Sequence, residues 1–588
     1  MIKQMTQVKN TKELSRRSFL AIAGGAASFA AMAAMGLPIE TKAYSANIPK
    51  IDMDKMEIEN NKTEVLVVGS GMAGLFAAVK AHDAGARVIL VSKGRLGSSG
   101  QTPFAKGIFA YDKNKARISL DAFTAKVARS ALETNNPIYT RQMAEHSYAR
   151  VNELREWGFF DSPLYNKSFS NPINQRNIPV IERVVCTHLI KEDGKIAGIA
   201  GFSLDGPKVH IFRAKSVILC TGAGGFKPNG FPICDLTHDG TIMAYHIGAK
   251  VTGKEWNDGH PGQSTNPAAC FDGWHGMFER KPGVTGVEIH HDLGVDLNYK
   301  AYMKGNPIEM GPPGMVPENK TSDGPYRPDE FARNGPAHGG PEGPRPFEGK
   351  RPETGGAPPG MGGTMVGGSS AGMSIHKSEG LVPINDKCES NIPGLYAAGD
   401  ALGSYMTGAI YTQIGSSLAG SAVQGAVAGE AAAMYCQDVE LPQIQPARLK
   451  TIHKEMLAPL KPKSGYSPAW VTQTLQGIMI PNFILYIKKE NLLKAALAYI
   501  EELRDHHAPS LRAADMHELR LAHETSNMIL NAEMKLRASI MRKESRCSHF
   551  RLDYPEPDYE HWNAWINIYK GHDGKMKLEK QHFTNWPS

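Results

Sequence analysis

The chain has no clustered cysteines. Its 588 residues include only seven, all isolated, with no C-x-x-C pair, no ferredoxin-like spacing and no C-x-x-C-H sequence. These are the spacings that hold zinc, iron–sulfur clusters and c-type haem. We therefore expect no metal centre and no cluster or haem of the chain's own. The seven are Cys186, Cys220, Cys234, Cys270, Cys388, Cys436 and Cys547.

The chain also lacks a strong charge imbalance. Its 66 basic and 59 acidic residues leave a net charge of +7, which is small for this length and spread along the chain. This argues against a nucleic-acid partner, while a weakly basic surface can attract an acidic substrate or redox partner. With 41% hydrophobic residues, the chain is globular, and its length predicts two or three domains.

The N-terminus resembles an export signal. Residues 15–20, SRRSFL, match the twin-arginine pattern, and a weakly hydrophobic, alanine-rich run follows over 21–37. A small-residue cleavage site ends at Ser45. We expect residues 1–45 to be a twin-arginine signal peptide, which places the folded enzyme in the periplasm or on the outer face of the cytoplasmic membrane. An uncleaved membrane anchor is the alternative.

Residues 63–93 predict a strand, a glycine turn, a helix and a second strand. Residues 65–68 form a continuous apolar run, and Gly69, Gly71 and Gly74 then give G-x-G-x-x-G where strand becomes helix. The first glycine permits the tight turn, the second lets backbone approach a pyrophosphate, and the third lets the helix pack on the strand. The stretch therefore predicts a dinucleotide site.

Further small-residue turns follow this unit. Residues 97–102 and 105–107 can present backbone amides to a flavin or phosphate. Helical periodicity over 135–157 precedes a β-meander. The apolar strand 214–220 then runs into Thr221-Gly222, a second close backbone approach. The next helix is predicted over 241–248, and the Asp239 carboxylate before it is predicted to be free to accept hydrogen bonds from a ribose hydroxyl or from the backbone.

Four later motifs resemble the fumarate reductase and succinate dehydrogenase flavoprotein family, with its adenylylsulfate reductase, urocanate reductase and ketosteroid dehydrogenase relatives. They are EWNDGHP at 255–261, IPGLYAAGD at 392–400, IGSSL at 414–418 and ESRCSHFRLDYP at 544–555. Together with the first glycine turn they span nearly the whole mature chain.

The resemblance implies an α/β fold with a Rossmann-like FAD-binding domain, an inserted capping (substrate) domain and a C-terminal helical domain. The FAD-binding domain is expected at 60–240 and 380–440, and the helical domain at 441–588. The capping domain is expected at 241–379. It contains a Gly/Pro-rich loop, 305–363, for which disorder and an ordered lid both remain open.

The implied cofactor is FAD. Covalent members of the family carry the flavin on a histidine near the 98–100 turn; none is present there, so we expect FAD to be noncovalent. The expected FAD-binding residues are Gly69, Gly71, Gly74, Ser92, Lys93, Ser98, Ser99, Gly100, Gly107, Cys186, Thr221, Gly222, Asp239, Asp400, Ser416, Ser417 and Leu418.

The expected catalytic residues are His260, Arg327, Arg333 and Tyr411. His260 fits a carboxylate clamp of the family, and the two arginines are alternative proton donors. Tyr411 stands where the family has a substrate arginine, so the site is predicted to be aromatic, with Tyr405 and Met406 as further contacts. For each residue, a purely structural role is the alternative.

These features predict an extracytoplasmic FAD-dependent oxidoreductase that reduces an activated C=C bond of an enoate or enone. Its partners are a small-molecule substrate and a separate electron carrier such as a cytochrome c, with membrane contact only through the export signal. The alternatives are the reverse dehydrogenation, an adenylylsulfate-reductase-like reaction, and a non-catalytic electron carrier.

Overall fold

The structure is a computed structural model. It describes residues 56–227, 233, 235–257, 279–287, 289, 377–461, 464–480 and 482–586, together with the backbone of three short strands at 262–263, 266–270 and 365–366. The predicted signal peptide, 1–45, and the Gly/Pro-rich loop, 305–363, lie outside the described residues. Among the described helices, none combines the length and apolar character that crossing a bilayer requires.

A seven-stranded mixed sheet carries the fold. Its strand order is β4-β2-β1-β7-β6-β5, and β14 pairs with the end of β7. The strands are β1 (Glu57–Val68), β2 (Val88–Val91), β4 (Val180–Ile181), β5 (Val184–Glu192), β6 (Lys195–Ser203), β7 (Lys208–Leu219) and β14 (Leu395–Ala397). The pairs β1–β2, β1–β7, β7–β14 and β2–β4 are parallel, and β5, β6 and β7 form the predicted meander.

The two central strands are longer than the apolar runs predict. β1 and β7 pair in parallel from Glu57↔Lys208 to Val68↔Leu219. The first half of β1, EIENNK, is mostly exposed, so its polar residues hide the strand from a hydrophobicity pattern. β7 pairs with β6 along its first half and with β14 along its last three residues. The carboxyl ends of β1, β2, β7 and β14 therefore meet at one edge.

Two helices built from small residues pack against this sheet and against each other. They are α3 (Met72–Asp83) and α10 (Ser416–Gln437). A Cβ on Gly425 would lie 2.3 Å from the Ala73 carbonyl oxygen, and one on Gly429 would lie 2.5 Å from that of Ala77. The glycines of α10 are thus needed for close packing on α3. The predicted helix after residue 135 is α5 (Pro137–Glu156), with its apolar face buried.

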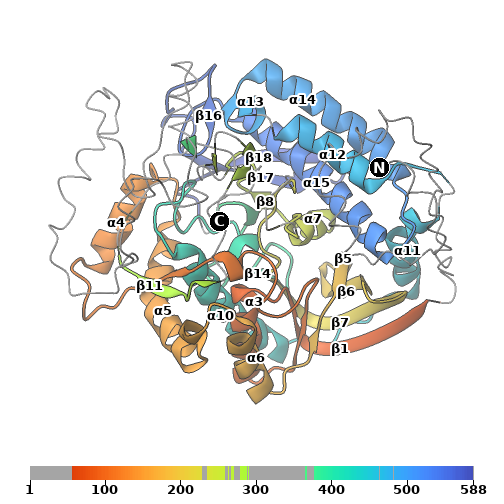
Figure 1. The fold of residues 1–588 in the computed structure, drawn as a ribbon, viewed down its shortest axis with the longest axis horizontal. Helices are drawn as coiled ribbons and strands as arrows, with labels where there is room; N and C mark the ends of the chain where they lie inside the picture. The colour runs from red at the N-terminus through yellow and green to blue at the C-terminus, as the bar shows by residue number, and fades with distance from the viewer. Residues whose placement is uncertain are drawn as a thin grey trace, which may run out of the picture. The chain divides into compact units, whose positions relative to one another are not determined.

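The C-terminal part is helical up to Met541, as predicted. Its helices are α11 (Pro446–Met456), α12 (Pro468–Met479), α13 (Asn482–Leu485), α14 (Glu490–Glu502) and α15 (Met516–Met541). In α15 the residues Met516, Leu519, Ala522, Met528 and Met534 of the predicted apolar stripe are buried, while Leu530 and Ile540 are partly buried. Figure 1 shows α12, α14 and α15 grouped together, away from β1 and β7.

The last sixty residues are not helical throughout. β17 (Ala564–Lys570) and β18 (Met576–His582) form an antiparallel hairpin, which extends a second sheet in the order β13-β8-β17-β18. Its other strands are β8 (Val251–Thr252) and β13 (Gly380–Leu381). β17 reads AWINIYK, and five of its seven residues are buried. The C-terminal hairpin thereby pairs with β8, near the start of the predicted capping region, and β8 pairs with β13, just after the end of that region.

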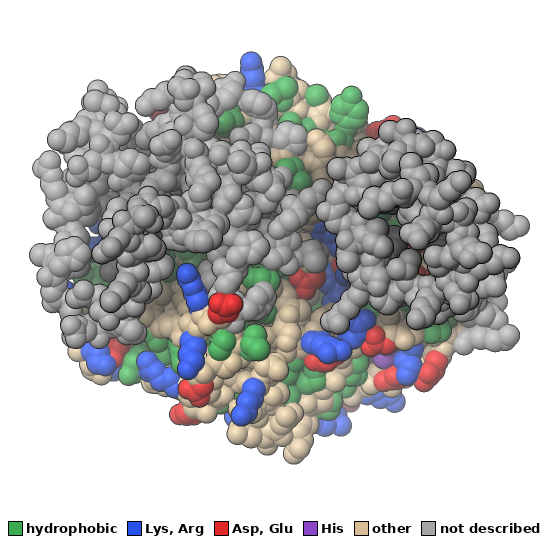
Figure 2. Space-filling model, in the orientation of Figure 1, with side chains coloured by type: hydrophobic (Ala, Val, Ile, Leu, Met, Phe, Trp, Pro, Cys, Tyr) green, Lys and Arg blue, Asp and Glu red, His purple; other side chains and the backbone are tan. Residues whose placement is uncertain are grey.

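The described surface carries mixed charge. In the view of Figure 2, basic and acidic side chains lie interspersed over the described part of the face. This agrees with the small net charge of the sequence.

Candidate cofactor site

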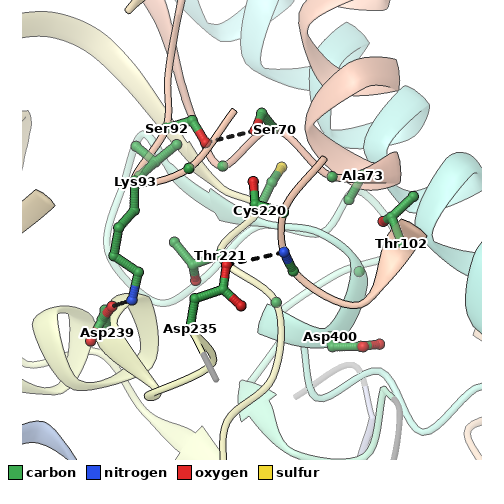
Figure 3. A pocket seen from close by; sticks show the side chains of 18 of the residues that line it. Ser70, Ala73, Ser92, Lys93, Thr102, Cys220, Thr221, Asp235, Asp239 and Asp400 are labelled. Atoms are coloured by element: carbon green, nitrogen blue, oxygen red, sulfur yellow. Dashed lines mark hydrogen bonds and ion pairs between the residues drawn. The ribbon is translucent and has the colours of Figure 1, made fainter. Parts of the chain in front are cut away.

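A cleft lies at the edge where the parallel strands end. Its lining includes Val68 at the end of β1, Val91 at the end of β2, Cys220 just after β7 and Ala398 just after β14. In open α/β sheets, ligands bind outside the carboxyl ends of the strands. Figure 3 shows that the labelled side chains around this cleft come from several elements far apart in sequence.

The glycine turn brings backbone close to backbone at the floor of the cleft. Gly69 has φ +111°, and a Cβ there would lie 2.2 Å from the Cys220 carbonyl oxygen. A Cβ on Gly74 would lie 1.8 Å from the Gly69 carbonyl oxygen. The Gly69 amide donates to Val91 O at 2.8 Å, and the Cys220 amide donates to Val68 O at 2.8 Å. As predicted, Gly69 forms the tight turn and Gly74 allows the helix to pack closely on the strand.

The N-terminus of α3 faces the middle of the cleft. Gly71 precedes the helix and provides no side-chain cap, and the first turn contains no acidic residue. The Met72 amide donates to the Thr102 hydroxyl at 3.1 Å. Free helix N-termini favour anions because their amides and the helix dipole point outward. This end of α3 can therefore accept a pyrophosphate.

A buried ion-pair cluster closes the β2 end of the cleft. Lys93 lies 2.7 Å from the Asp239 carboxylate (Figure 3). It also lies 2.8 Å from the Glu524 carboxylate. Burial alone would lower the pKa of Lys93, but the two carboxylates outweigh it and raise the pKa. Burial likewise opposes ionisation of Asp239, yet Lys93 holds the pKa of Asp239 below its usual value. Lys93 and Asp239 are therefore both charged.

Asp239 is not free, contrary to the prediction from sequence. Its Oδ2 accepts from Lys93, and its Oδ1 accepts from the Thr237 hydroxyl and from the Asn527 amide, each at 2.8 Å. The carboxylate is occupied because α15 packs over the start of α7 (Asp239–His246) and supplies Asn527. Its structural role is to hold Lys93 at the cleft.

One polar atom in the cleft has no partner. The Thr221 hydroxyl oxygen is buried and makes no hydrogen bond in the described part of the chain. Gly222 follows with φ +72°, and a Cβ there would lie 3.3 Å from Leu236 Cδ2. Opposite it, the Gly100 amide donates to Asp235 at 3.1 Å. A buried, unpaired hydroxyl is costly unless a ligand binds it, so this position fits a dinucleotide.

Most of the predicted cofactor residues line the cleft. Those that line it are Gly69, Gly71, Ser92, Lys93, Ser99, Gly100, Cys186, Thr221, Gly222, Asp239 and Asp400. Those that do not are Gly74, Ser98, Gly107, Ser416, Ser417 and Leu418.

The residues off the cleft have identifiable positions. Gly74 packs under Gly69, and Ser98 is exposed, with its hydroxyl donating to Leu96 O. Gly107 belongs to β3 (Gly107–Phe109), which pairs with β11 (Gly283–Thr285). The remaining three, residues 416–418, open α10.

Cys186, the cysteine predicted to bind the cofactor, is inert. Burial and the nearby Asp239 carboxylate raise the pKa of the Cys186 thiol to about 12. Reactive cysteines are thiolates, and this one stays protonated at neutral pH. Cys186 therefore contributes only packing at the wall of the cleft.

Of the predicted catalytic residues, the structure describes Tyr411. His260, Arg327 and Arg333 lie outside the described residues. The Tyr411 hydroxyl accepts a hydrogen bond at 3.1 Å from the amide of Gly415, the residue that precedes α10. Tyr411 is thus fixed at the N-terminus of α10.

Tyr405 and Met406 are core residues, so their predicted substrate contact is wrong. Tyr405 is 2% exposed, stacks on Trp565 with ring centroids 5.1 Å apart, and bonds Thr252 and Trp256 through its hydroxyl. Met406 is fully buried. The sequence did not reveal this because the partners of Tyr405 come from the C-terminal hairpin and from β8.

The C-terminal signature forms a buried ionic cluster. Arg542 pairs with Glu255 at 2.9 Å and Glu544 at 2.6 Å, and Glu544 also pairs with Arg546. Nδ1 of His549 lies 2.8 Å from the Lys488 ammonium nitrogen. These side chains hold the segment that leads into residues 258–261. Within the described residues, Arg546 and His549 therefore brace the fold and do not line the cleft.

Within the described residues, no group of three or more histidine, cysteine, aspartate or glutamate side chains could hold a metal ion. The donor set at the cleft consists of backbone amides, hydroxyls and carboxylates. This is the chemistry that binds ribose and phosphate.

Two functional residues at the cleft could not be found from sequence. Glu524 binds Lys93 from α15, 431 positions further along the chain, and no motif surrounds it. Asp235 follows the β7 turn without a spacing that marks it as a ligand. The available sequence signal was the absence of the usual acidic residue at the end of β2, where Lys93 stands instead. A lysine at this position indicates that an acidic partner comes from elsewhere in the chain.

Fold and site together define an FAD-binding flavoprotein. Residues 64–177 match the FAD binding domain family, and residues 472–587 match the family described as fumarate reductase flavoprotein C-term. The chain is an FAD-dependent oxidoreductase, and in these two regions it is similar to the flavoproteins of fumarate reductases and succinate dehydrogenases.

Full-length relatives agree with this assignment. An uncharacterized FAD-dependent oxidoreductase of Methanocaldococcus jannaschii is 26% identical, over 89% of this chain and 98% of that protein. A fumarate reductase (CoM/CoB) polypeptide of Methanothermobacter marburgensis is 24% identical, over 85% of this chain and 96% of that protein. A mutant of the flavoprotein chain of E. coli quinol fumarate reductase shares the fold, with a TM-score of 0.70, 17% identity, and coverage of 89% of this chain and 97% of that one.

Proposed function

We propose that this enzyme acts on CH–CH bonds and reduces an activated C=C bond of an enoate or enone. The observation that carries the proposal is the joint match to an FAD-binding domain and to a fumarate reductase C-terminal region around a cleft that fits a dinucleotide. A relative of similar length is named as part of a fumarate reductase. Bound FAD supplies hydride chemistry, and the protein supplies binding, orientation and electrostatics.

Different residues along the cleft are proposed to bind different parts of FAD. Lys93, held by Asp239 and Glu524, fixes the β2 end, while the N-terminus of α3 binds the pyrophosphate. The Thr221 hydroxyl, which has no partner among the described residues, gains one when the cofactor binds. Asp400 at the opposite end can accept hydroxyl protons of the ribityl chain.

Tyr411 is the proposed donor of a proton to the substrate, or of a hydrogen bond to an oxyanion that develops on it. Its oxygen accepts from the Gly415 amide, so the hydroxyl hydrogen is donated in another direction. A hydrogen bond from this amide stabilises negative charge that develops on the Tyr411 oxygen. Because tyrosine replaces a cationic clamp, the proposed substrate has fewer carboxylates than fumarate.

The proposed cell location and partners follow from the twin-arginine pattern at 15–20. A folded, FAD-loaded enzyme is exported and receives electrons from a separate carrier such as a cytochrome c. FAD is proposed to be noncovalent because residues 94–110 contain no histidine.

The test uses the holoenzyme with its FAD reduced by dithionite under argon. Fumarate, urocanate, cinnamates and enones are mixed in separately, and return of the oxidised flavin spectrum is followed. We expect reoxidation by a monocarboxylate enoate or an enone, and slower reoxidation in Tyr411→Phe at unchanged FAD content. If none of these compounds reoxidises the flavin, and a saturated substrate reduces an added dye, the enzyme is a dehydrogenase. A sulfite-dependent spectral change would favour the adenylylsulfate-reductase-like reaction.

A further inference from the structure

A buried lysine joins the cleft to the N-terminus of α10. The Lys377 side chain is completely buried and forms an ion pair with Asp400. Its ammonium group also donates to the Ser417 carbonyl oxygen at 2.8 Å and lies 3.4 Å from the Ser417 hydroxyl. None of the sequence motifs includes Lys377. It links two regions that the motifs identified separately.

The backbone fixes this position. Lys377 has φ +64°, and its carbonyl oxygen accepts from the Tyr405 amide at 2.7 Å. A Cβ on Gly420 would lie 3.3 Å from Lys377 Cε, so this glycine leaves room for the lysine chain beside α10. A residue in the left-handed region with its side chain fully buried is tightly constrained by its surroundings.

The orientation of the dinucleotide follows from the cleft itself. The ribose of the nucleotide half lies at the end of the second strand, here at Ser92 and Lys93, and the pyrophosphate lies on the N-terminus of α3. The other half must then extend away from Lys93. In Figure 3 Lys93 and Asp239 lie on one side of the glycine turn and Asp400 on the other. Asp400, and with it Lys377, is at the flavin end.

A second observation indicates a ligand at this end. Ser416, the first residue of α10, is 1% exposed, and its hydroxyl has no hydrogen-bond partner in the described part of the chain. The N-terminus of this 22-residue helix carries no acidic residue in its first turn and no side-chain cap. The ammonium group of Lys377, the helix end and the unpaired hydroxyl together suit a group that becomes negative.

We propose that Lys377 lies beside the flavin and makes the protein bind reduced FAD more tightly than oxidised FAD. Two electrons and one proton entering the flavin leave a negative charge on its pyrimidine ring, and a buried cation within the same site stabilises that charge. Asp400 offsets part of this effect because it pairs with Lys377. The inference needs bound FAD only, and it holds for either direction of the reaction.

Burial lowers the pKa of Lys377, and Asp400 opposes that shift. Removing either member of the pair therefore changes the charge at the flavin end in opposite directions. Lys377→Met leaves the Asp400 carboxylate, and Asp400→Asn leaves the Lys377 ammonium. This opposition separates an electrostatic role from a purely structural one.

The experiment measures the reduction potential of FAD in the holoenzyme by equilibration with reference dyes at saturating FAD. We expect Lys377→Met to lower the affinity for reduced FAD, relative to that for oxidised FAD, by about tenfold or more. This is the size expected for the loss of a hydrogen bond to a charged group. Asp400→Asn is expected to shift the ratio the other way, and Lys377→Arg to stay near wild type. Lys215→Met is the matched control, since Lys215 pairs with Glu64 within β1 and neither residue lines the cleft.

An unchanged potential in both Lys377→Met and Asp400→Asn would overturn the proposal, as would shifts of the same sign. An equal shift in Lys215→Met would also overturn it. If Lys377→Met does not fold, Asp400→Asn alone tests the proposal: a shift toward tighter binding of reduced FAD supports it, and no shift or the opposite shift contradicts it. Because no substrate is added, failure here is distinguishable from failure of the proposed reductase activity.

Discussion

Lys93 and Glu524 lie 431 positions apart in sequence, yet their side chains are 2.8 Å apart at the end of the cofactor cleft. Dinucleotide-binding folds usually have an acidic residue at the end of the second strand. Here that position is basic, and the acidic groups come from α7 and α15. The C-terminal helices are therefore part of the cofactor site.

The first prediction concerns this cluster. Lys93→Met leaves the Asp239 carboxylate without an ion pair, while Glu524 keeps Lys227. Breaking a buried ion pair by removing one partner costs about 3–5 kcal/mol. We expect a loss of that size in the free energy of urea-induced unfolding, together with weaker FAD binding. Arg87→Ala is the control, because Arg87 is 81% exposed where it pairs with Glu64 and should change stability by less than about 1 kcal/mol. Equal effects of the two substitutions would contradict the account.

The second prediction concerns the glycine turn. Gly69→Ala places a Cβ 2.2 Å from Cys220 O at a backbone φ of +111°. We expect this variant to lose bound FAD and to unfold at a lower temperature. Gly85→Ala is a matched control with φ +92° but no atom within 4 Å of the new Cβ. It should cost only about 1–2 kcal/mol of backbone strain and keep its FAD. The measurements are flavin absorbance per chain and the thermal midpoint.

The third prediction concerns acid stability. Burial would raise the pKa of Glu379, but Lys254 and Lys535, each 2.7 Å away, outweigh it and lower the pKa to about 2. A depressed carboxyl pKa gives stability that is present above the unfolded pKa, near 4.5, and is lost as pH falls toward 2. This shift corresponds to about 3 kcal/mol. Burial also lowers the pKa of the neighbouring His238 to about 3, so the folded state disfavours its protonation below pH 6.5.

Both groups therefore destabilise the protein in acid. We expect the free energy of unfolding, measured by urea titration at a series of pH values, to fall from pH 6 downwards. Glu379→Gln should flatten the part of this curve between about pH 4.5 and 2, and should lower stability at pH 7 because two buried lysines lose their counter-ion. An unchanged slope in this variant would contradict the assigned role.

The fourth prediction concerns the C-terminal brace. Arg542 is fully buried, pairs with Glu255 and Glu544, and lies 4.5 Å from the centre of the Trp256 ring. Arg542→Met leaves the buried Glu255 carboxylate without an ion pair and Glu544 with Arg546 alone, so we expect about 3–5 kcal/mol of lost stability. Arg448→Met is the control, because Arg448 is 50% exposed where it pairs with Glu192. Equal urea midpoints for the two variants would contradict a bracing role.

The sequence predicted the parts of the fold that local patterns encode. Gly69 and Gly74 are required by contacts within one βαβ unit, and α5 shows its apolar face as a simple periodicity. The polar first half of β1 was not recognised, because pairing with β7, and not hydrophobicity, keeps it extended. The C-terminal hairpin was missed although β17 is mostly buried, because its partner β18 is polar and the pairing of β17 with β8 is set by tertiary structure.

The site was less predictable than the fold. Residues adjacent to glycine motifs, such as Thr221 and Asp400, lie on the cleft as expected. Glu524 and Lys377 each form an ion pair with a residue that lines the cleft, and both come from segments that carry no motif, so only the tertiary structure reveals them. Tyr405 was misassigned because a tyrosine near a site motif looks the same in sequence whether it faces a ligand or the core.

The central claim is that the cleft between the glycine turn and Asp400 holds one noncovalent FAD. The most direct measurement is acid precipitation of the holoenzyme, with flavin quantified in the supernatant and in the pellet. The account predicts one FAD per chain, all of it in the supernatant, and none bound by Gly69→Ala. Flavin retained in the pellet, a mononucleotide in place of FAD, or full binding by Gly69→Ala would contradict it.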